Sequence, residues 1–124
     1  MATVEGKIGN LLLSVVIDSG SNKDIIPKFI ADELGLEIDT SVIHSIRGIF
    51  GKSRSLETVS TSITLAPECI IKTNPIIIDG NPIREIILSR ATLNQYNYNL
   101  REFRKHMAIT CNKKNFSIPI VLDK

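Results

Sequence analysis

A continuous apolar run that ends in an acidic residue is the feature that most constrains this chain. Five of the six residues from Leu12 to Ile17 are apolar, and Asp18-Ser19-Gly20-Ser21 follows at once. A carboxylate beside a buried strand is costly unless hydrogen bonds or function offset the cost. Asp-Ser-Gly alone is typical of a plain turn, because all three residues are turn formers. A surface turn does not need a hydrophobic strand before it, so the context favours a functional carboxylate at Asp18.

The residues after Asp18 suit such a site. Gly20 permits a sharp turn that brings backbone amides close to the carboxylate. Ser19 offers a hydroxyl that we expect to lock the turn. The strand from Leu11 to Ile17 is expected to be buried on both faces, and Gly9-Asn10 predicts a hairpin that joins it to residues 3–8.

The remaining pattern predicts an all-β, mainly antiparallel fold. Isoleucine is common and aromatic residues make up only 5% of the chain, and β-branched residues favour strands. We expect one domain over residues 1–124, built as a small closed or partly closed barrel. Two short helices are expected at residues 27–34, ended by Gly35, and at 91–96. Further strands are expected at residues 38–46, 55–65, 69–73, 75–78, 84–88, 107–111 and 116–121.

Composition argues against several classes of protein. The formal net charge of +2 is too balanced to indicate nucleic-acid or membrane binding. No apolar run approaches a membrane span, and no signal peptide is recognisable, so we expect a soluble cytoplasmic protein or a domain cut from a longer chain. Cys69 and Cys111 lack metal-type spacing; we expect two buried free thiols, with a single disulfide as the alternative.

Other ionisable residues give weaker signals. His44 and His106 show no metal-type spacing, so we expect no metal and no cofactor. Asp24 and Asp79 are expected to act as turn or capping residues.

Val16-Ile17-Asp18-Ser19-Gly20-Ser21, followed by Ile25-Ile26-Pro27 and Leu34-Gly35-Leu36, resembles the active-site region of retropepsins. These are the aspartic proteases of retroviruses, of long-terminal-repeat retrotransposons and of their domesticated relatives. A second landmark of the family, an apolar strand and then a short helix, is matched by Ile87, Leu88, Ser89 and Arg90. The family usually has glycine where this chain has Ser89. A glycine-bearing flap is matched by Arg47, Gly48, Ile49, Phe50 and Gly51.

The resemblance implies an aspartic endopeptidase with Asp18 as its catalytic residue. Two carboxylates are needed, one to activate water and one to polarise the scissile carbonyl. Because the chain has one Asp-Ser-Gly, a homodimer must supply the second, and residues 4–8 and 118–122 are expected to pair between subunits. The substrate is expected to be a protein or polyprotein bound as an extended strand under the flap, and the site is expected to work in the cytoplasm or in a virus-like particle. The alternative is a weak or inactive retropepsin-fold module that serves dimerisation or peptide binding.

Overall fold

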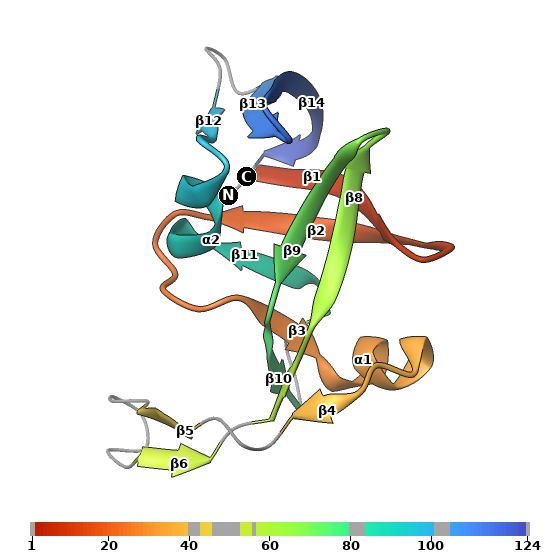
Figure 1. Ribbon diagram of the computed structural model, residues 1–124, viewed down its shortest axis with the longest axis vertical. Helices are drawn as coiled ribbons and strands as arrows, with labels where there is room; N and C mark the ends of the chain where they lie inside the picture. The colour runs from red at the N-terminus through yellow and green to blue at the C-terminus, as the bar shows by residue number, and fades with distance from the viewer. Residues whose placement is uncertain are drawn as a thin grey trace.

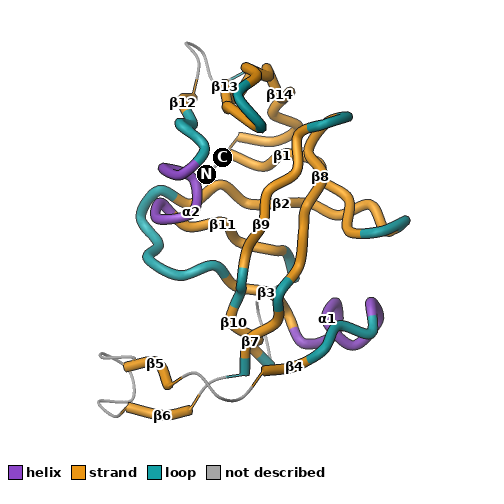
Figure 2. The backbone as a smooth tube through the Cα atoms, in the orientation of Figure 1, coloured by secondary structure: helices purple, strands orange, loops and turns teal. Residues whose placement is uncertain are grey.

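The computed structural model describes residues 2–39, 43–45, 53–55, 57–79, 84–100 and 105–123. Strands dominate, and two short helices lie on opposite sides of the molecule (Figures 1 and 2). The strands of the first half are β1 (Ala2–Ile8), β2 (Leu11–Asp18), β3 (Ile25–Pro27), β4 (Ile38–Asp39), β5 (Ile43–Ser45), β6 (Ser53–Ser55), β7 (Thr58–Val59) and β8 (Thr61–Ala66). Those of the second half are β9 (Cys69–Thr73), β10 (Ile76–Ile78), β11 (Ile86–Ser89), β12 (Asn99–Leu100), β13 (His106–Cys111) and β14 (Lys114–Asp123). The helices are α1 (Lys28–Leu34) and α2 (Arg90–Gln95).

The hairpin predicted at Gly9-Asn10 is confirmed. Ile8 faces Leu11 in the antiparallel ladder between β1 and β2, and Gly9 has a φ of +59° that suits glycine. The expectation that β2 is buried on both faces holds only for its second half. Residues 15–17 are buried, whereas Leu12 is 56% exposed. The buried half of the strand is the part that leads into Asp18.

Two parallel pairs form the centre of the sheet. β2 pairs in parallel with β11, β3 pairs in parallel with β10, and β11 also pairs antiparallel with β3. In Figure 1 the arrows of β2 and β11 point the same way and end beside α2. This arrangement brings the end of β2 next to the residues that open α2.

The prediction of a closed barrel is wrong. The strand path is open and runs β12-β13-β14-β1-β2-β11-β3-β10-β7-β4, with the β8–β9 hairpin joined to β1 at Lys7 and Thr64. Its two terminal strands, β12 and β4, have two residues each and lie at opposite ends of the molecule (Figure 1). Closure of a barrel requires the first and last strands to pair, and strands this short and this far apart do not.

Both predicted helices are present. α1 begins at Lys28, one residue later than expected, because Pro27 is its N-cap rather than its first residue, and Gly35 ends the helix with a left-handed φ of 63°. The Gly35 and Leu36 amides donate to the carbonyls of Asp32 and Ala31, both at 3.1 Å, which closes the helix as a C-terminal glycine does. α2 begins one residue before the expected start.

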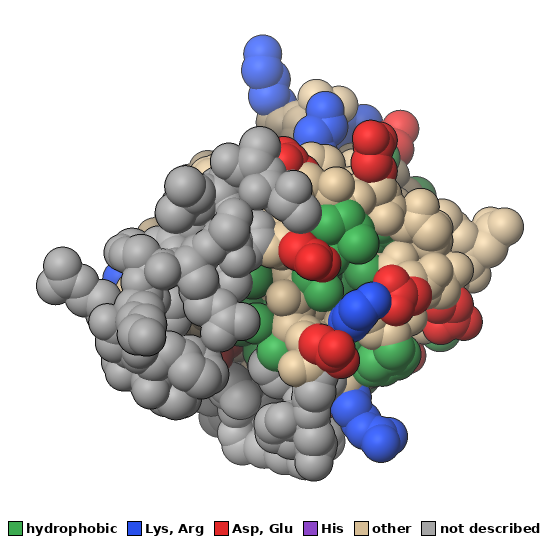
Figure 3. All heavy atoms as spheres, turned by 90° about the horizontal axis from the view of Figure 1, so that it is seen from below, with side chains coloured by type: hydrophobic (Ala, Val, Ile, Leu, Met, Phe, Trp, Pro, Cys, Tyr) green, Lys and Arg blue, Asp and Glu red, His purple; other side chains and the backbone are tan. Residues whose placement is uncertain are grey.

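The buried side chains form one hydrophobic cluster. Ten of its members are buried isoleucines, which agrees with the β-rich reading of the composition: Ile8, Ile17, Ile26, Ile30, Ile63, Ile71, Ile77, Ile86, Ile109 and Ile118. The surface in Figure 3 mixes acidic and basic side chains, with no continuous patch of one sign on its coloured part.

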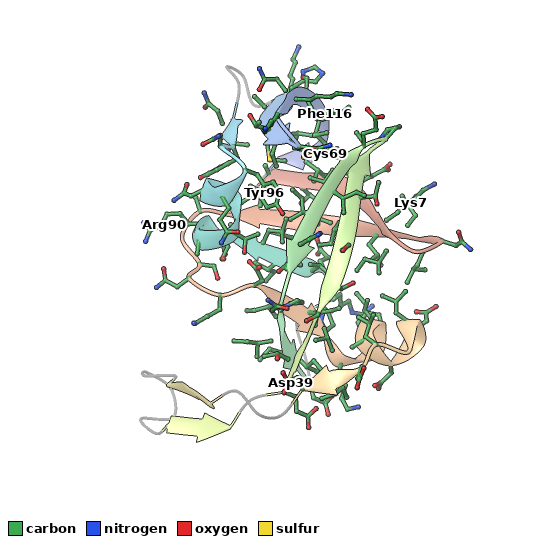
Figure 4. The ribbon with its side chains drawn as sticks, viewed as in Figure 1. Lys7, Asp39, Cys69, Arg90, Tyr96 and Phe116 are labelled. Atoms are coloured by element: carbon green, nitrogen blue, oxygen red, sulfur yellow. A yellow bond between two sulfur atoms is a disulfide. The ribbon has the colours of Figure 1, made fainter. Side chains whose placement is uncertain are left out.

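The two cysteines are joined by a disulfide, so the expectation of free thiols is wrong. Cys69 in β9 and Cys111 in β13 are 42 residues apart in sequence, yet their Cα atoms lie 5.0 Å apart, within the range that a disulfide needs. Figure 4 shows the bond beside Cys69, between the two hairpins. The packing of β9 against β13 creates this proximity, which sequence spacing does not reveal.

The chain ends pair with each other. Ala2 faces Asp123 and Val4 faces Ile120 in the ladder between β1 and β14, while the other side of β1 pairs with β2. Ala2 to Val4 therefore have neighbours on both sides within one chain, so the pairing that was expected between subunits for residues 4–8 and 118–122 is replaced at Val4 and Ile120 by pairing within the chain. Among the described residues, no helix is long and apolar enough to cross a membrane.

The strands expected at residues 38–46 and 55–65 pair with each other in their described parts. β4 pairs with β7, and β5 pairs with β6 in a separate two-stranded sheet in which Ser45 faces Ser53. The tip, Arg47 to Gly51, lies outside the described residues. The paired strands on either side of it nevertheless agree with a hairpin.

Candidate active site

Asp18 is the last residue of β2 and is half-buried. The three residues before it, Val15 to Ile17, are buried in the core, so the strand fixes the backbone from which the carboxylate projects. Ser89, the last residue of β11, lies opposite Asp18 in the parallel ladder. The two segments that the sequence singled out are thus brought together.

A compact turn follows Asp18. The Gly20 amide donates to the Asp18 Oδ1 atom at 3.0 Å, and the Ser21 amide donates to the Asp18 carbonyl at 3.2 Å. A Cβ added at Gly20 would lie 3.4 Å from the same carboxylate oxygen, an ordinary contact. Glycine here therefore leaves room beside the carboxylate rather than relieving a clash.

Ser19 was expected to lock the turn, but the hydroxyl that makes a hydrogen bond there is that of Ser21. Ser21 Oγ donates to the Lys23 carbonyl at 2.9 Å. Ser19 and Gly20 are exposed. The turn after Asp18 is therefore accessible to solvent or to another chain, while Asp18 itself is half-buried.

Ser89 fits its position without backbone strain. Its φ of −85° and ψ of 165° are open to any residue, so glycine is not required there. Ser89 is 1% exposed and is the N-cap of α2, with its Oγ accepting from the Thr92 amide at 3.5 Å. The serine that departs from the family pattern thus has a structural use of its own.

Asp24 is not a turn or capping residue, and that prediction is wrong. Its side chain is buried, with 8% of the residue exposed. Asp24 Oδ1 accepts from the Ser89 amide at 2.7 Å, and Oδ2 accepts from the hydroxyls of Thr73 and Thr92. Three donors offset the cost of burying a carboxylate.

Arg90 joins the same turn to α2. Its amide donates to the Ser21 carbonyl at 3.1 Å, and its guanidinium reaches Asn22 Oδ1 at 3.5 Å. In Figure 4 the Arg90 side chain lies at the start of α2, beside the loop that follows β2. Ile87 and Leu88, the rest of the second landmark, pair with Val16 and Ile17.

The remaining predicted site residues cannot be placed. Arg47, Gly48, Ile49, Phe50 and Gly51 all lie outside the described residues. In the part of the chain that is described, no group of three or more His, Cys, Asp and Glu side chains gathers in a way that holds a metal ion.

Comparisons with solved structures identify the architecture. The retroviral protease-like domain of Ddi1 from Leishmania major superposes with a TM-score of 0.74 over 98% of this chain and 94% of that one, at 19% identity. This chain has the retropepsin-like fold. Its similarity extends to a retropepsin-like aspartic protease from Rickettsia conorii, with a TM-score of 0.54 over 93% of this chain and 82% of that one, at 14% identity.

A third structure with the retropepsin-like fold is more distant. The foamy viral protease-reverse transcriptase, solved with an RNA/DNA hybrid, gives a TM-score of 0.50 over 77% of this chain and 12% of that one, at 13% identity. No protein-family model and no curated protein matches the sequence. At such identities the shared property is the fold, so the chemistry must be argued from the site.

Sequence reasoning missed Asp24, Thr73 and Thr92. The partners of Asp24 lie 49, 65 and 68 residues away along the chain, so no local pattern joins them. One signal was present: Asp24 directly precedes the apolar residues 25–27, as Asp18 directly follows apolar residues. An acidic residue at either end of a buried segment is a candidate for a buried carboxylate.

Proposed function

We propose that this chain is an aspartic endopeptidase that works as a homodimer, with one Asp18 from each subunit. The observation that carries the proposal is the position of Asp18 at the end of a buried strand, opposite Ser89 and followed by an exposed turn whose Gly20 amide donates to its carboxylate. The retropepsin-like fold supports this assignment.

The need for a dimer follows from the chemistry. Peptide hydrolysis by carboxylates requires one group that accepts a proton from water and another that is protonated and binds the carbonyl oxygen. The chain offers one Asp-Ser-Gly. A two-fold axis near the exposed residues Ser19 and Gly20 would bring two copies of Asp18 together around one water.

The proposed reaction proceeds in two stages. The ionised Asp18 takes a proton from the water, whose oxygen attacks the scissile carbonyl carbon while the protonated Asp18 of the other subunit gives its proton to the carbonyl oxygen. Collapse of the tetrahedral intermediate then breaks the C–N bond. The amine leaves with the proton that the first Asp18 took from water, and one hydroxyl of the intermediate returns its proton to the Asp18 of the other subunit, which gives a carboxylic acid product and restores the starting carboxyl pair. No metal or covalent intermediate is needed.

We expect the substrate to be an unfolded segment or a polyprotein, bound as an extended strand. Backbone hydrogen bonds to such a strand supply affinity, and side-chain pockets supply preference. We expect Arg47 to Gly51, the segment between the paired strands β5 and β6, to cover the substrate. Processing of a polyprotein by a retrotransposon-type protease is the biological role that this chemistry would serve.

The alternative role is an inactive module for dimerisation or peptide binding. It rests on Ser89, which stands where the family usually has glycine. Because Ser89 occupies an ordinary extended conformation and caps α2, it offers no obstacle to the arrangement of Asp18. We therefore favour the active enzyme.

Peptide cleavage by the purified chain and by Asp18→Asn tests the proposal. The substitution keeps the size of the side chain and an oxygen for the Gly20 amide, so the fold should survive. We expect the unmodified chain to cleave an unfolded protein at mildly acidic pH, with inhibition by a statine-type compound, and the variant to be inactive. Glu33→Gln, an exposed change on α1, serves as the matched control and should cleave normally. Equal cleavage by the Asp18 variant would refute the proposal.

A further inference from the structure

The buried carboxylate of Asp24 is not used in the proposed reaction, yet it contacts three separate segments. Its donors are the Ser89 amide at the end of β11, the Thr92 hydroxyl in α2 and the Thr73 hydroxyl at the end of β9. Such a carboxylate is costly to bury. A hydrophobic residue would fill the same space without that cost, so the hydrogen bonds themselves call for an explanation.

The Asp24 backbone is also held. Its carbonyl accepts from the Ile76 amide at 2.9 Å, where β10 begins to pair with β3. Asp24 is therefore fixed through its main chain on one side and through its side chain on the other. A residue held in this way defines the far end of the loop that begins at Asp18.

The near end of the loop depends on the same neighbours. Ser89 lies opposite Asp18 in the ladder, and the Arg90 amide binds the Ser21 carbonyl at 3.1 Å. Any shift of the Ser89–Arg90 segment would move both the partner strand of Asp18 and the contact with Ser21. The bond from Ser89 to Asp24 is what fixes that segment against the loop.

We infer that Asp24 is a positioning residue, whose carboxylate holds the junction of β11 and α2 against the Asp18 turn and so sets the orientation of the Asp18 carboxylate. The inference rests on the proposed function for its effect on catalysis. The effect of the Asp24 carboxylate on the contact between Arg90 and Ser21 does not depend on that function. The residue does not touch the reacting atoms, so its removal should lower kcat more than it alters KM.

Two substitutions separate hydrogen bonding from mere occupancy. Asp24→Ala removes every acceptor and leaves the Ser89 amide without its partner. Asp24→Asn keeps one oxygen for that amide, and its NH₂ group can donate to the threonine hydroxyls, which also accept. Asp24→Asn should therefore rescue most of what Asp24→Ala loses. Ile63→Val, a core truncation in β8 where Ile63 is fully buried, is the control for lost stability without a change at the site.

The experiment measures kcat and KM of the folded dimers and, in parallel, amide hydrogen exchange at Arg90. For Asp24→Ala we expect kcat to fall about 10- to 100-fold with little change in KM, since small misplacements of catalytic groups have effects of this size. We also expect faster exchange at Arg90. Asp24→Asn should stay within about fivefold of the unmodified kcat, since it keeps the acceptor, and Ile63→Val should change neither readout.

The outcomes distinguish the two claims. If the unmodified chain cleaves no peptide, the proposed function fails, and exchange at Arg90 alone decides the inference. A folded Asp24→Ala protein with unchanged kcat and unchanged Arg90 exchange would overturn the inference. If Asp24→Ala does not fold, Thr92→Val removes one donor at nearly constant shape. Thr92→Val should speed amide exchange at Arg90 and lower kcat, each by less than the effect expected for Asp24→Ala. An absence of both effects would overturn the inference.

Discussion

Asp18 and Ser89 lie opposite each other at the ends of two parallel strands, β2 and β11. One strand leads into the Asp-Ser-Gly turn and the other leads into α2, so the two parts of the site that are far apart in sequence share one ladder position. The geometry of the Asp18 carboxylate therefore depends on how β11 ends.

Ser89→Gly is expected to leave activity unchanged. The φ of −85° at Ser89 needs no glycine, so the substitution relieves no strain and should not raise kcat/KM. Ser89→Ala should lower the free energy of unfolding by about 0.5–1 kcal/mol through loss of the cap on α2, and Ser89→Gly by less. Denaturant titration and steady-state kinetics check both effects. A large gain in kcat/KM for Ser89→Gly would show that serine hinders the site.

Reduction of the disulfide is expected to destabilise the fold without acting on the site directly. The bond between Cys69 and Cys111 closes a long loop, and loops of this length correspond to about 2–4 kcal/mol. Both cysteines are buried, so reductant should act mainly through unfolded molecules. Denaturation with and without reductant measures the loss, and a variant with alanine at both positions is the matched control that should not respond to reductant. An unchanged midpoint on reduction would contradict the assignment.

Gly6→Ala is expected to overpack the core between β1 and β8. A Cβ at Gly6 would lie 2.7 Å from Ile63 Cγ2 and 3.1 Å from Val15 Cγ2. Overpacking of this kind costs about 1–3 kcal/mol of unfolding free energy. Combination with Ile63→Ala removes the closest atom, so the double variant should lose less than the sum of the two single changes. Simple additivity would show that the strain lies elsewhere.

The activity of the dimer is expected to follow a bell-shaped pH profile on the acidic side of neutral. Hydrolysis requires one ionised and one protonated carboxyl group, so it should fail when both are protonated and again when both are ionised. Measurement of kcat/KM across the acidic and neutral range checks the profile. Activity that stays constant to neutral pH and beyond, with no acidic or alkaline limb, would argue against two carboxylates that share a proton.

Local sequence signals predicted the local elements well. The turn at Gly9-Asn10, the helix that Gly35 ends and the strands expected at residues 107–111 and 116–121 all depend on residues within a few positions of one another. Those two strands, β13 and β14, form a hairpin, and its turn residues Asn112 and Lys113 have positive φ angles. The position of Asp18 after a buried strand was also readable from the sequence.

Features that depend on distant contacts were not readable. The disulfide exists because β9 packs against β13, and the role of Asp24 exists because β9, β11 and α2 converge on it. The open sheet likewise depends on which strands pair at its ends, where β4 and β12 are too short to show a clear pattern. Each of these features is set by tertiary packing, which the local pattern of residues along one chain does not specify.

The most direct test of the central claim mixes the unmodified chain with Asp18→Asn under conditions where subunits exchange. If each active site needs one Asp18 from each subunit, only dimers of two unmodified chains are active. At equal amounts and constant total protein, activity should fall to about a quarter of that of the unmodified chain alone. Activity that falls only in proportion to the amount of unmodified chain, to about half, would contradict a shared site.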